Sequence, residues 1–268
     1  MEYDIIKDYL REPMRRSPWV RKLAYRLYEL SFLRVRYVQR ELKRLILHHP
    51  SRLQVLDAGF GFGPYLNFLL RSFPQIQVTG LEVKAEQIED CKTYFHQSGF
   101  GSRVEFVHRD LLEYEETEKF DLAIAVDILE HIEDDVRAMR NICRALKKTG
   151  MLVIHTPGSS VDSRESVEKE FFVREHVRIG YTPQELWEKL IQAGFQKIKL
   201  RYTYGRYGMI AYWLMQGIPL RLINLQLLLS VLLPFYYLLT FPFAHRLMQA
   251  DLARKLVQGK GLLVVAEK

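Results

Sequence analysis

Three alternating glycines form the most specific chemical pattern in this sequence. Gly59, Gly61 and Gly63 lie in VLDAGFGFG, directly after a short apolar run. Glycines let a ligand approach the backbone closely, and the free amides at the start of a helix favour anionic groups. A dinucleotide-binding fingerprint would place a further glycine where the sequence has Pro64. The loop therefore predicts a nucleotide-like cofactor of another kind.

Carboxylates at the ends of successive predicted strands narrow the choice of cofactor. Asp57 lies within the glycine motif, and Glu82 follows 25 residues later, where it can accept hydrogen bonds from both hydroxyls of a ribose. Asp110 comes at the end of the next apolar segment and can accept a hydrogen bond from an adenine amino group. Together with the glycines, these residues predict an adenosine-containing cofactor.

Alternating strands and helices must position these residues. Strand-like and helix-like patterns alternate from residue 53 to residue 204, which is typical of a parallel sheet covered by helices on both faces. Ligands of such sheets bind at the carboxyl ends of the strands. We predict strands at 53–59, 77–83, 103–110, 120–129, 150–158, 195–204 and 261–268, and helices at 64–73, 85–99, 133–150 and 182–194.

The pattern resembles the class I S-adenosylmethionine-dependent methyltransferases, in particular methyltransferase type 11 and ubiquinone-biosynthesis methyltransferases. The matching stretches are VLDAGFGFG, GLEVK, VEFVHRDLLEY, FDLAIAVDILEHIED and EHVRIGYTPQELWEKLIQAGF. They cover about residues 50–205, and the final strand GLLVVAEK also matches. The resemblance implies a Rossmann-like, seven-stranded, mostly parallel α/β sheet whose last strand is antiparallel.

The resemblance also assigns roles in binding S-adenosylmethionine. The glycine loop and Asp57 would hold the methionine moiety. Glu82, with its neighbour Val83, would lie at the ribose, and Asp110 with Leu111 at the adenine. The end of the fourth strand would face the sulfonium and the acceptor through Asp127 and Ile128.

Histidines are the candidate bases for methyl transfer to an oxygen acceptor, which requires removal of a proton. His131 is our first candidate because the end of its strand faces the cofactor, and His155 and His176 are the others. Asp127, Glu130 and His131 form D-x-x-E-H, similar to the E-x-x-E-H metal site of some methyltransferases. The same string occurs in relatives without a metal, and we predict none here.

Composition predicts a reduced, intracellular protein. The chain has 268 residues, 48% of them hydrophobic, and only two cysteines, Cys91 and Cys143, with no metal-ligand spacing. The first twenty residues carry charges and lack the apolar core of a signal peptide.

A basic segment precedes the predicted sheet. Residues 11–44 contain eleven Lys or Arg and three acidic residues, a net charge of +8 within a chain of +7. Two amphipathic helices fit this segment, one with Val20, Leu23, Ala24, Leu27 and Leu30 on its apolar face and one with Val35, Val38, Leu42, Leu45 and Ile46. Such a segment suits an anionic membrane or a nucleic acid.

An apolar segment separates the last two predicted strands. Residues 222–244 carry no charge over 23 positions, a length that would suffice for a transmembrane helix. Both flanking strands belong to one sheet, so a single span is excluded if the sheet is correct. Pro219, Pro234 and Pro242 also interrupt the segment. We expect a hairpin or helices lying in the membrane interface, with a buried helical subdomain or lid as the alternative.

These observations predict a membrane-associated S-adenosylmethionine-dependent methyltransferase. The acceptor would be a lipophilic small molecule such as a quinone precursor, an isoprenoid or a sterol-like lipid, and the protein would be peripheral or monotopic on a cytoplasmic face. The alternatives are an RNA methyltransferase, which the absence of an Asn/Asp-Pro-Pro-Tyr/Phe string makes less favoured, and a non-catalytic lipid-binding or assembly protein. The acceptor atom and the oligomeric state stay open. The predicted domains are residues 1–50, 51–205, 206–259 and 260–268.

Overall fold

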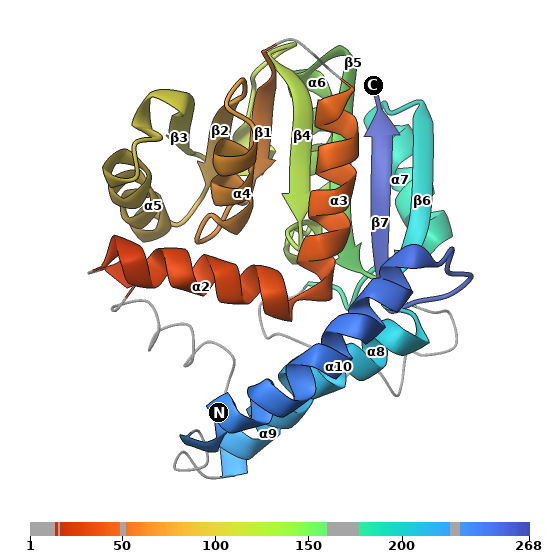
Figure 1. Ribbon diagram of the computed structural model, residues 1–268. Coiled ribbons are helices and arrows are strands. Elements are labelled where there is room, and N and C mark those ends of the chain that lie inside the picture. Colours follow the sequence, from red (N-terminus) through yellow and green to blue (C-terminus); the bar gives the residue numbers. More distant parts are fainter. Residues whose placement is uncertain (1–13, 16, 49–51, 160–176, 226–230) are drawn as a thin grey trace.

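A seven-stranded sheet forms the centre of the computed structural model, which describes residues 14–15, 17–48, 52–159, 177–225 and 231–268 (Figure 1). The strand order is β3-β2-β1-β4-β5-β7-β6, and only β7 is antiparallel to its neighbours. This confirms the predicted fold class. The strands are β1 (Gln54–Ala58), β2 (Gln77–Glu82), β3 (Val104–His108), β4 (Phe120–Val126), β5 (Leu146–Pro157), β6 (Lys197–Thr203) and β7 (Gly261–Glu267).

Helices cover both faces of the sheet and bury two apolar layers. In Figure 1, α3 and α4 lie in front of the sheet, whereas α6 and α7 lie behind it. Each layer contains fully buried side chains, for example Leu66 on the first side and Ile142 on the second. The core helices are α4 (Pro64–Ser72), α5 (Ala85–Gln97), α6 (Asp135–Ala145) and α7 (Pro183–Ala193), with short 3-10 turns η1 (Gly101–Arg103), η2 (Leu111–Glu113) and η3 (Leu129–His131).

One predicted helix boundary is wrong. We expected the helix beginning near residue 133 to continue to Gly150, but α6 ends at Ala145 and β5 begins at Leu146. Leu146 has extended backbone angles and pairs with Phe120 on β4, and both side chains are completely buried. Burial of the Leu146 side chain in the core therefore outweighs the helical pattern that the sequence shows up to Gly150.

Two N-terminal helices pack against the core, and only one does so through its apolar face. They are α2 (Pro18–Ser31) and α3 (Leu33–Leu47), separated at Phe32 as the sequence pattern predicted. The apolar side chains predicted for α3 are buried. In α2, by contrast, Leu23 and Leu27 are 44% and 54% exposed, whereas Arg21 and Tyr25 are buried. The predicted apolar face of α2 thus points largely outward.

Hydrogen bonds explain the reversed orientation of α2. The Arg21 guanidinium donates to the carbonyl oxygens of Phe62 and Asp90 at 2.9 and 2.6 Å, and its Nε donates to the Tyr25 hydroxyl. These partners offset the cost of removing the charge from water. α2 therefore lies against the glycine loop.

A helical hairpin occupies the connection between β6 and β7. Its first arm contains α8 (Arg206–Tyr212), the π-helical turn η4 (Trp213–Gly217) and α9 (Ile218–Leu225), and its second is α10 (Leu233–Ala253). The arms run side by side (Figure 1), and Tyr236 and Tyr237 of α10 donate to backbone carbonyls of η4. Among the described helices, none combines the length and apolar character needed to cross a membrane.

A buried carboxylate fixes the base of this hairpin. Asp251 of α10 is fully buried and accepts hydrogen bonds from the Tyr37 hydroxyl and from the backbone amides of Gly205 and Gly208. It thereby joins both arms of the hairpin to α3. These contacts do not test the predicted domain boundaries, which remain a prediction.

Candidate active site

The glycine loop follows β1 and has a backbone that side chains would disfavour. Gly59, Gly61 and Gly63 have φ angles of 77°, 56° and 83°, in the left-handed region. A Cβ atom on Gly59 would lie 2.7 Å from the side chain of Ile128, whereas one on Gly61 would meet nothing closer than 3.9 Å. The space beside Gly61 is open for a ligand. The sequence prediction of close backbone approach is consistent with this geometry.

Two carboxylates lie beside the loop. Glu82, at the end of β2, accepts from the amide of Gly61 at 3.0 Å and from the amides of Val83 and Lys84 at 2.9 and 3.1 Å. An ionised carboxylate offers about four acceptor sites, so acceptor capacity remains for a ribose hydroxyl. Asp57 is buried, and its Oδ2 has no hydrogen-bond partner among the described residues. Burial, together with the negative charge of Glu82, raises the pKa of Asp57 well above its usual value.

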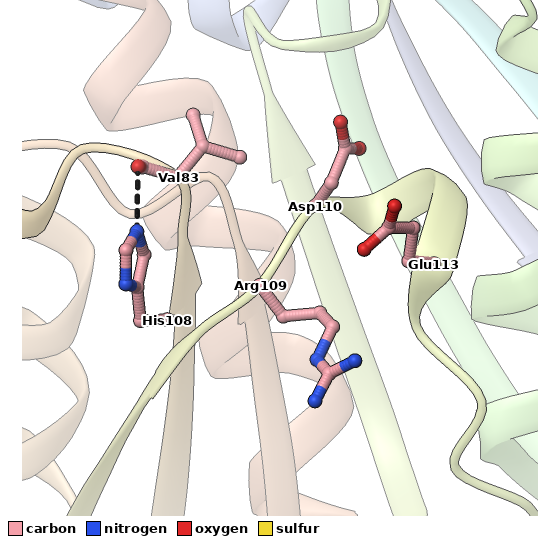
Figure 2. A pocket seen from close by; sticks show the side chains of 5 residues that line it. All are labelled: Val83, His108, Arg109, Asp110 and Glu113. Carbon is pink, nitrogen blue, oxygen red and sulfur yellow. Dashed lines mark hydrogen bonds between the residues drawn. The ribbon is translucent and has the colours of Figure 1, made fainter.

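A pocket of about 390 Å³ opens at the carboxyl ends of β2 and β3 (Figure 2). Val83 and Asp110 project to the same side of it, and Arg109 points the opposite way. The His108 ring lies 2.9 Å from the Val83 carbonyl oxygen, and Asp110 accepts from the amide of Leu112, which leaves its second oxygen for a ligand. The exposed side chain of Val83 beside a carboxylate oxygen of Asp110 suits an adenine ring.

A second set of polar side chains lies at the ends of β4, β5 and β6, on the same edge of the sheet as the pocket. Asp127 follows β4 in a left-handed conformation (φ 51°), and its Oδ1 lies 2.9 Å from Nδ1 of His155 on β5. The other ring nitrogen of His155 lies 3.2 Å from the hydroxyl of Thr203 on β6. The imidazole is 4% exposed. His155 is therefore better placed to orient Asp127 than to take a proton from an acceptor.

The remaining predicted histidines occupy different positions. His131 lies in η3, partly exposed, and its backbone amide donates to the carbonyl of Ile128. His176 lies outside the described residues. Glu130 is fully buried and accepts from the hydroxyl of Thr156 at 3.1 Å. No cluster of three or more possible metal ligands occurs among the residues that the structure describes.

Sequence reasoning missed an arginine that reaches this edge from α3. Arg34 forms an ion pair with Asp127 and donates to the Tyr28 hydroxyl at 2.9 Å, and its backbone amide donates to the Tyr204 hydroxyl. The side chains of Arg34 and Asp127 are 26% and 19% exposed. The only sign of Arg34 in the sequence is the break in the helical pattern at residues 31–34. This break does not show which residues Arg34 contacts. Tyr65, at the start of α4, was missed as well.

Comparison with known proteins identifies the family. Residues 49–204 match the family described as "Methyltransferase domain", more than half of the chain. A malonyl-[acyl-carrier protein] O-methyltransferase of Acetivibrio thermocellus is 31% identical over 117 residues, 44% of this chain and 40% of the relative. A ubiquinone biosynthesis O-methyltransferase of Rickettsia akari is 23% identical over 130 residues, 48% of this chain and 50% of the relative. The chain spans about half the length of the curated relatives it matches.

Solved structures share the fold. Phosphoethanolamine N-methyltransferase 2 of Haemonchus contortus, in complex with S-adenosylmethionine, superposes with a TM-score of 0.61 at 21% identity, covering 85% of this chain and 51% of that one. The [4+2]-cyclase SpnF superposes with a TM-score of 0.56 at 20% identity, covering 85% and 80%. The fold is thus that of the S-adenosylmethionine-dependent methyltransferases. The chain belongs to this methyltransferase family, as the sequence pattern indicated.

The described residues fit the cofactor of the family, S-adenosylmethionine. The open side of Gly61, the unpartnered oxygen of Asp57 and the pocket beside Asp110 follow one another along the sheet edge. An ammonium group would supply the partner that the buried Asp57 lacks. These observations are consistent with the predicted adenosine site at β1–β3, which remains a prediction. The Arg34–Asp127 pair lies farther along the same edge of the sheet.

Proposed function

We propose that this protein transfers a methyl group from S-adenosylmethionine to a lipophilic acceptor while it is docked on a membrane surface. The loop from Gly59 to Gly63 with Asp57 would hold the methionine moiety, Glu82 with Val83 the ribose, and Asp110 with Leu111 the adenine. Asp127 and Ile128 would lie toward the acceptor. When bound, S-adenosylmethionine supplies an electrophilic methyl group on its sulfonium. The chain contributes position and charge around that group.

The exposed apolar surface of the hairpin is the observation that carries the membrane part of this proposal. It consists of Val231, Leu232, Phe235, Leu238, Leu239 and Phe243, each more than half exposed. We call these residues the hairpin surface. Singly exposed apolar residues are common, but a cluster of this size is typical of a site that meets lipid or protein. The hairpin leaves the sheet at the carboxyl end of β6 (Figure 1), the edge at which Asp127 and His155 also lie.

The outward face of α2 extends the apolar surface. Trp19, Leu23, Leu27 and Leu30 are all exposed, and they repeat at helical spacing. Lys22 and Arg26 on the same helix are exposed as well. Ser31, at the end of α2, accepts a hydrogen bond from Gln216 in η4, so α2 ends beside the hairpin. Apolar side chains flanked by basic ones suit the interface of an anionic bilayer.

RNA methylation is a weaker candidate because much of the basic segment has internal partners. Arg21 is buried against the glycine loop, and Arg34 is paired with Asp127. Arg40 donates to the carbonyl of Leu252, and Arg44 pairs with Glu41. These groups are less available to phosphates than the charge count suggested.

Vesicle binding tests the proposal. The full chain is sedimented with vesicles of phosphatidylcholine and phosphatidylglycerol, as wild type and as the triple variant Phe235→Ser, Leu238→Ser, Leu239→Ser. Burial of one such side chain contributes about 1.5–3 kcal/mol, so the variant should bind vesicles at least about tenfold more weakly. Its S-adenosylhomocysteine affinity, measured by calorimetry, should be unchanged, because the substituted side chains lie outside the cofactor site.

A matched control comes from exposed apolar residues on another helix. Trp187 and Ile191 of α7 are 45% and 42% exposed on the opposite face of the sheet. The variant Trp187→Ser, Ile191→Ser should keep wild-type vesicle binding. Equal vesicle binding by the hairpin variant and wild type would remove the membrane role of the hairpin. Absence of S-adenosylhomocysteine binding in wild type would favour the non-catalytic alternative.

A further inference from the structure

Six side chains from six elements meet at the acceptor half of the sheet edge. Asp127 and His155 come from the ends of β4 and β5, Tyr204 follows β6, and Tyr28, Arg34 and Tyr65 come from α2, α3 and α4. We call this group the acceptor cluster. The adenosine half of the site, at β2 and β3, uses none of these residues.

Arg34 is the only cation whose contacts within the cluster are seen in the described part of the chain. Its guanidinium pairs with Asp127 and donates to the Tyr28 hydroxyl at 2.9 Å. It also lies over aromatic rings, 5.1 Å from the centroid of Phe32 and 5.8 Å from that of Tyr28. An aromatic surface that would favour a substituted ammonium is therefore already covered by a cation. Binding an amine there would place two positive charges together.

Tyrosine hydroxyls supply further donors. Tyr65 is 5% exposed, and its hydroxyl has no hydrogen-bond partner among the described residues although Arg34, Asp127 and Tyr204 are within electrostatic reach. Burial raises the pKa of Tyr65 and of Tyr204, so both hydroxyls stay protonated at neutral pH. The Tyr204 hydroxyl accepts from the Arg34 amide at 3.0 Å, which leaves its own hydrogen for another acceptor. A buried hydroxyl without a partner costs free energy unless a ligand supplies one.

His155 holds the negative member of the ion pair in place. One of its ring nitrogens meets Asp127 and the other meets Thr203. Asp127 keeps a left-handed backbone, a conformation that costs energy in a residue with a side chain. The negative charge of Asp127 is thus fixed, and it balances Arg34.

Charge balance then decides which acceptor the site suits. Among the described residues of the acceptor cluster, the charges of Arg34 and Asp127 cancel each other, and S-adenosylmethionine, when bound, adds the positive charge of its sulfonium. An acceptor bound as an oxyanion makes the loaded site neutral, whereas an ammonium or a neutral amine leaves it positive. In a partly buried site an uncompensated charge is costly.

We propose that Arg34, with the hydroxyls of Tyr65 and Tyr204, binds the methyl acceptor through an oxyanion, so that the protein selects ionisable hydroxyl acceptors of the phenol or enol class over amines. The acceptor loses its hydroxyl proton to solvent on binding. This inference rests on the proposed methyltransferase function and narrows its substrate class. His155 is a positioning residue in it.

A water-soluble phenol that changes colour on ionisation tests the proposal. The full chain, saturated with sinefungin, an analogue of S-adenosylmethionine that carries an ammonium in place of the sulfonium, is titrated with 4-nitrocatechol over a range of pH and followed by its visible absorption. The affinity for benzylamine, an aromatic cation of similar size, is measured by calorimetry for comparison. Wild type should lower the apparent pKa of the bound phenol by about one unit, the equivalent of a tenfold preference for the anion, and should bind the phenol at least tenfold more tightly than benzylamine.

Three variants separate recognition from folding. Arg34→Gln should abolish the pKa shift of the probe and weaken phenol binding at least tenfold. Arg40→Gln on the same helix, which contacts Leu252 rather than the cluster, should behave as wild type. Tyr65→Phe removes a hydroxyl that has no partner, so it should leave thermal stability equal or higher and still weaken phenol binding several-fold. A variant that is merely destabilised would not combine unchanged or higher thermal stability with weaker phenol binding.

The outcomes distinguish the inference from the proposed function. Binding of sinefungin without phenol binding overturns the inference and leaves the methyltransferase proposal standing. An unshifted pKa of the bound phenol, tighter binding of benzylamine, or an unchanged shift in Arg34→Gln also overturns it. Failure to bind S-adenosylhomocysteine at all overturns both. No lipid is present in these titrations, so vesicle binding is judged separately.

Discussion

The hydroxyl of Tyr25 lies 2.6 Å from the carbonyl oxygen of Phe62 and ties α2 to the glycine loop. The same carbonyl accepts from Arg21, whose Nε donates to the Tyr25 hydroxyl at 2.8 Å. Three groups thus form a closed hydrogen-bonded set between an N-terminal helix and the glycine loop. The helix that covers the loop is held by buried polar contacts, and its apolar side chains remain outside.

Removal of this hydroxyl should destabilise the protein measurably. In Tyr25→Phe, Arg21 loses the partner of its Nε inside the fold, so the free energy of unfolding should fall by about 1–2 kcal/mol. Urea denaturation followed by circular dichroism measures the change. Tyr202→Phe, a partly buried tyrosine on β6, is the control and should change stability by less than about 0.5 kcal/mol. Equal midpoints for the two variants would contradict a structural role for the Tyr25 contact.

Glu82 should determine cofactor affinity. Its carboxylate accepts from three backbone amides at the turn after β2, and the amide group of a glutamine cannot repeat this arrangement. We expect Glu82→Gln to weaken S-adenosylhomocysteine binding at least tenfold, about 1.4 kcal/mol, in isothermal calorimetry. Glu89→Gln, an exposed substitution on α5, should bind as wild type. If both variants bind alike, the ribose does not lie at Glu82.

Glu130 should make stability depend on pH. Burial first, and then the negative charge of Asp127, raise the pKa of Glu130 to about 8. In the unfolded chain the pKa is about 4.3. Between these values the folded protein binds a proton that the unfolded chain releases. The free energy of unfolding should therefore decrease as pH rises from about 4.3 toward about 8.

The variant Glu130→Gln should lose this part of the pH dependence because glutamine does not titrate. Urea denaturation at pH 5.5 and pH 8 compares it with wild type. The difference in unfolding free energy between the two pH values should be smaller in the variant, and at pH 8 the variant should be the more stable protein. A pH dependence identical to that of wild type would show that Glu130 is ionised in the folded state.

Asp251 should hold the hairpin to the core. Asp251→Ala leaves the Tyr37 hydroxyl and two backbone amides without their common acceptor in a buried place, so we expect a loss of about 3 kcal/mol or more. Asp134→Ala removes a solvent-exposed helix cap and should cost about 1 kcal/mol. Limited proteolysis should cut the hairpin of the Asp251 variant first. Uniform cleavage throughout the chain would instead indicate global unfolding.

The sheet, and the position of the predicted adenosine-site residues along one edge of it, could be predicted because their signals are local. Each strand is a short apolar run, and Gly59, Glu82 and Asp110 each lie at the end of such a run. The topology of a parallel sheet then brings the strand ends to one edge. The helix predicted at residues 182–194 also agrees with α7, which is capped by Thr182, whose hydroxyl accepts from the amide of Glu185 at 3.1 Å.

The acceptor cluster could not be predicted in the same way because its contacts join segments that are distant in the sequence. Arg34 and Asp127 are 93 residues apart, and nothing in their neighbouring sequence couples them. The hydrophobic periodicity of a helix also does not show which side of the helix packs against the core. It correctly identified the apolar side of α2, but the buried side is the one that carries Arg21 and Tyr25.

The hairpin begins and ends at points that are neighbours in the sheet. Thr203, the last residue of β6, pairs with Gly261, the first residue of β7. Removing everything between them would leave a gap that a short turn can close, and lengthening it would not change the register of any strand. The strand register is thus independent of the length of this connection. The outer part of the hairpin, beyond Tyr204 and Asp251, can vary in evolution or design while the seven strands keep their order and pairing.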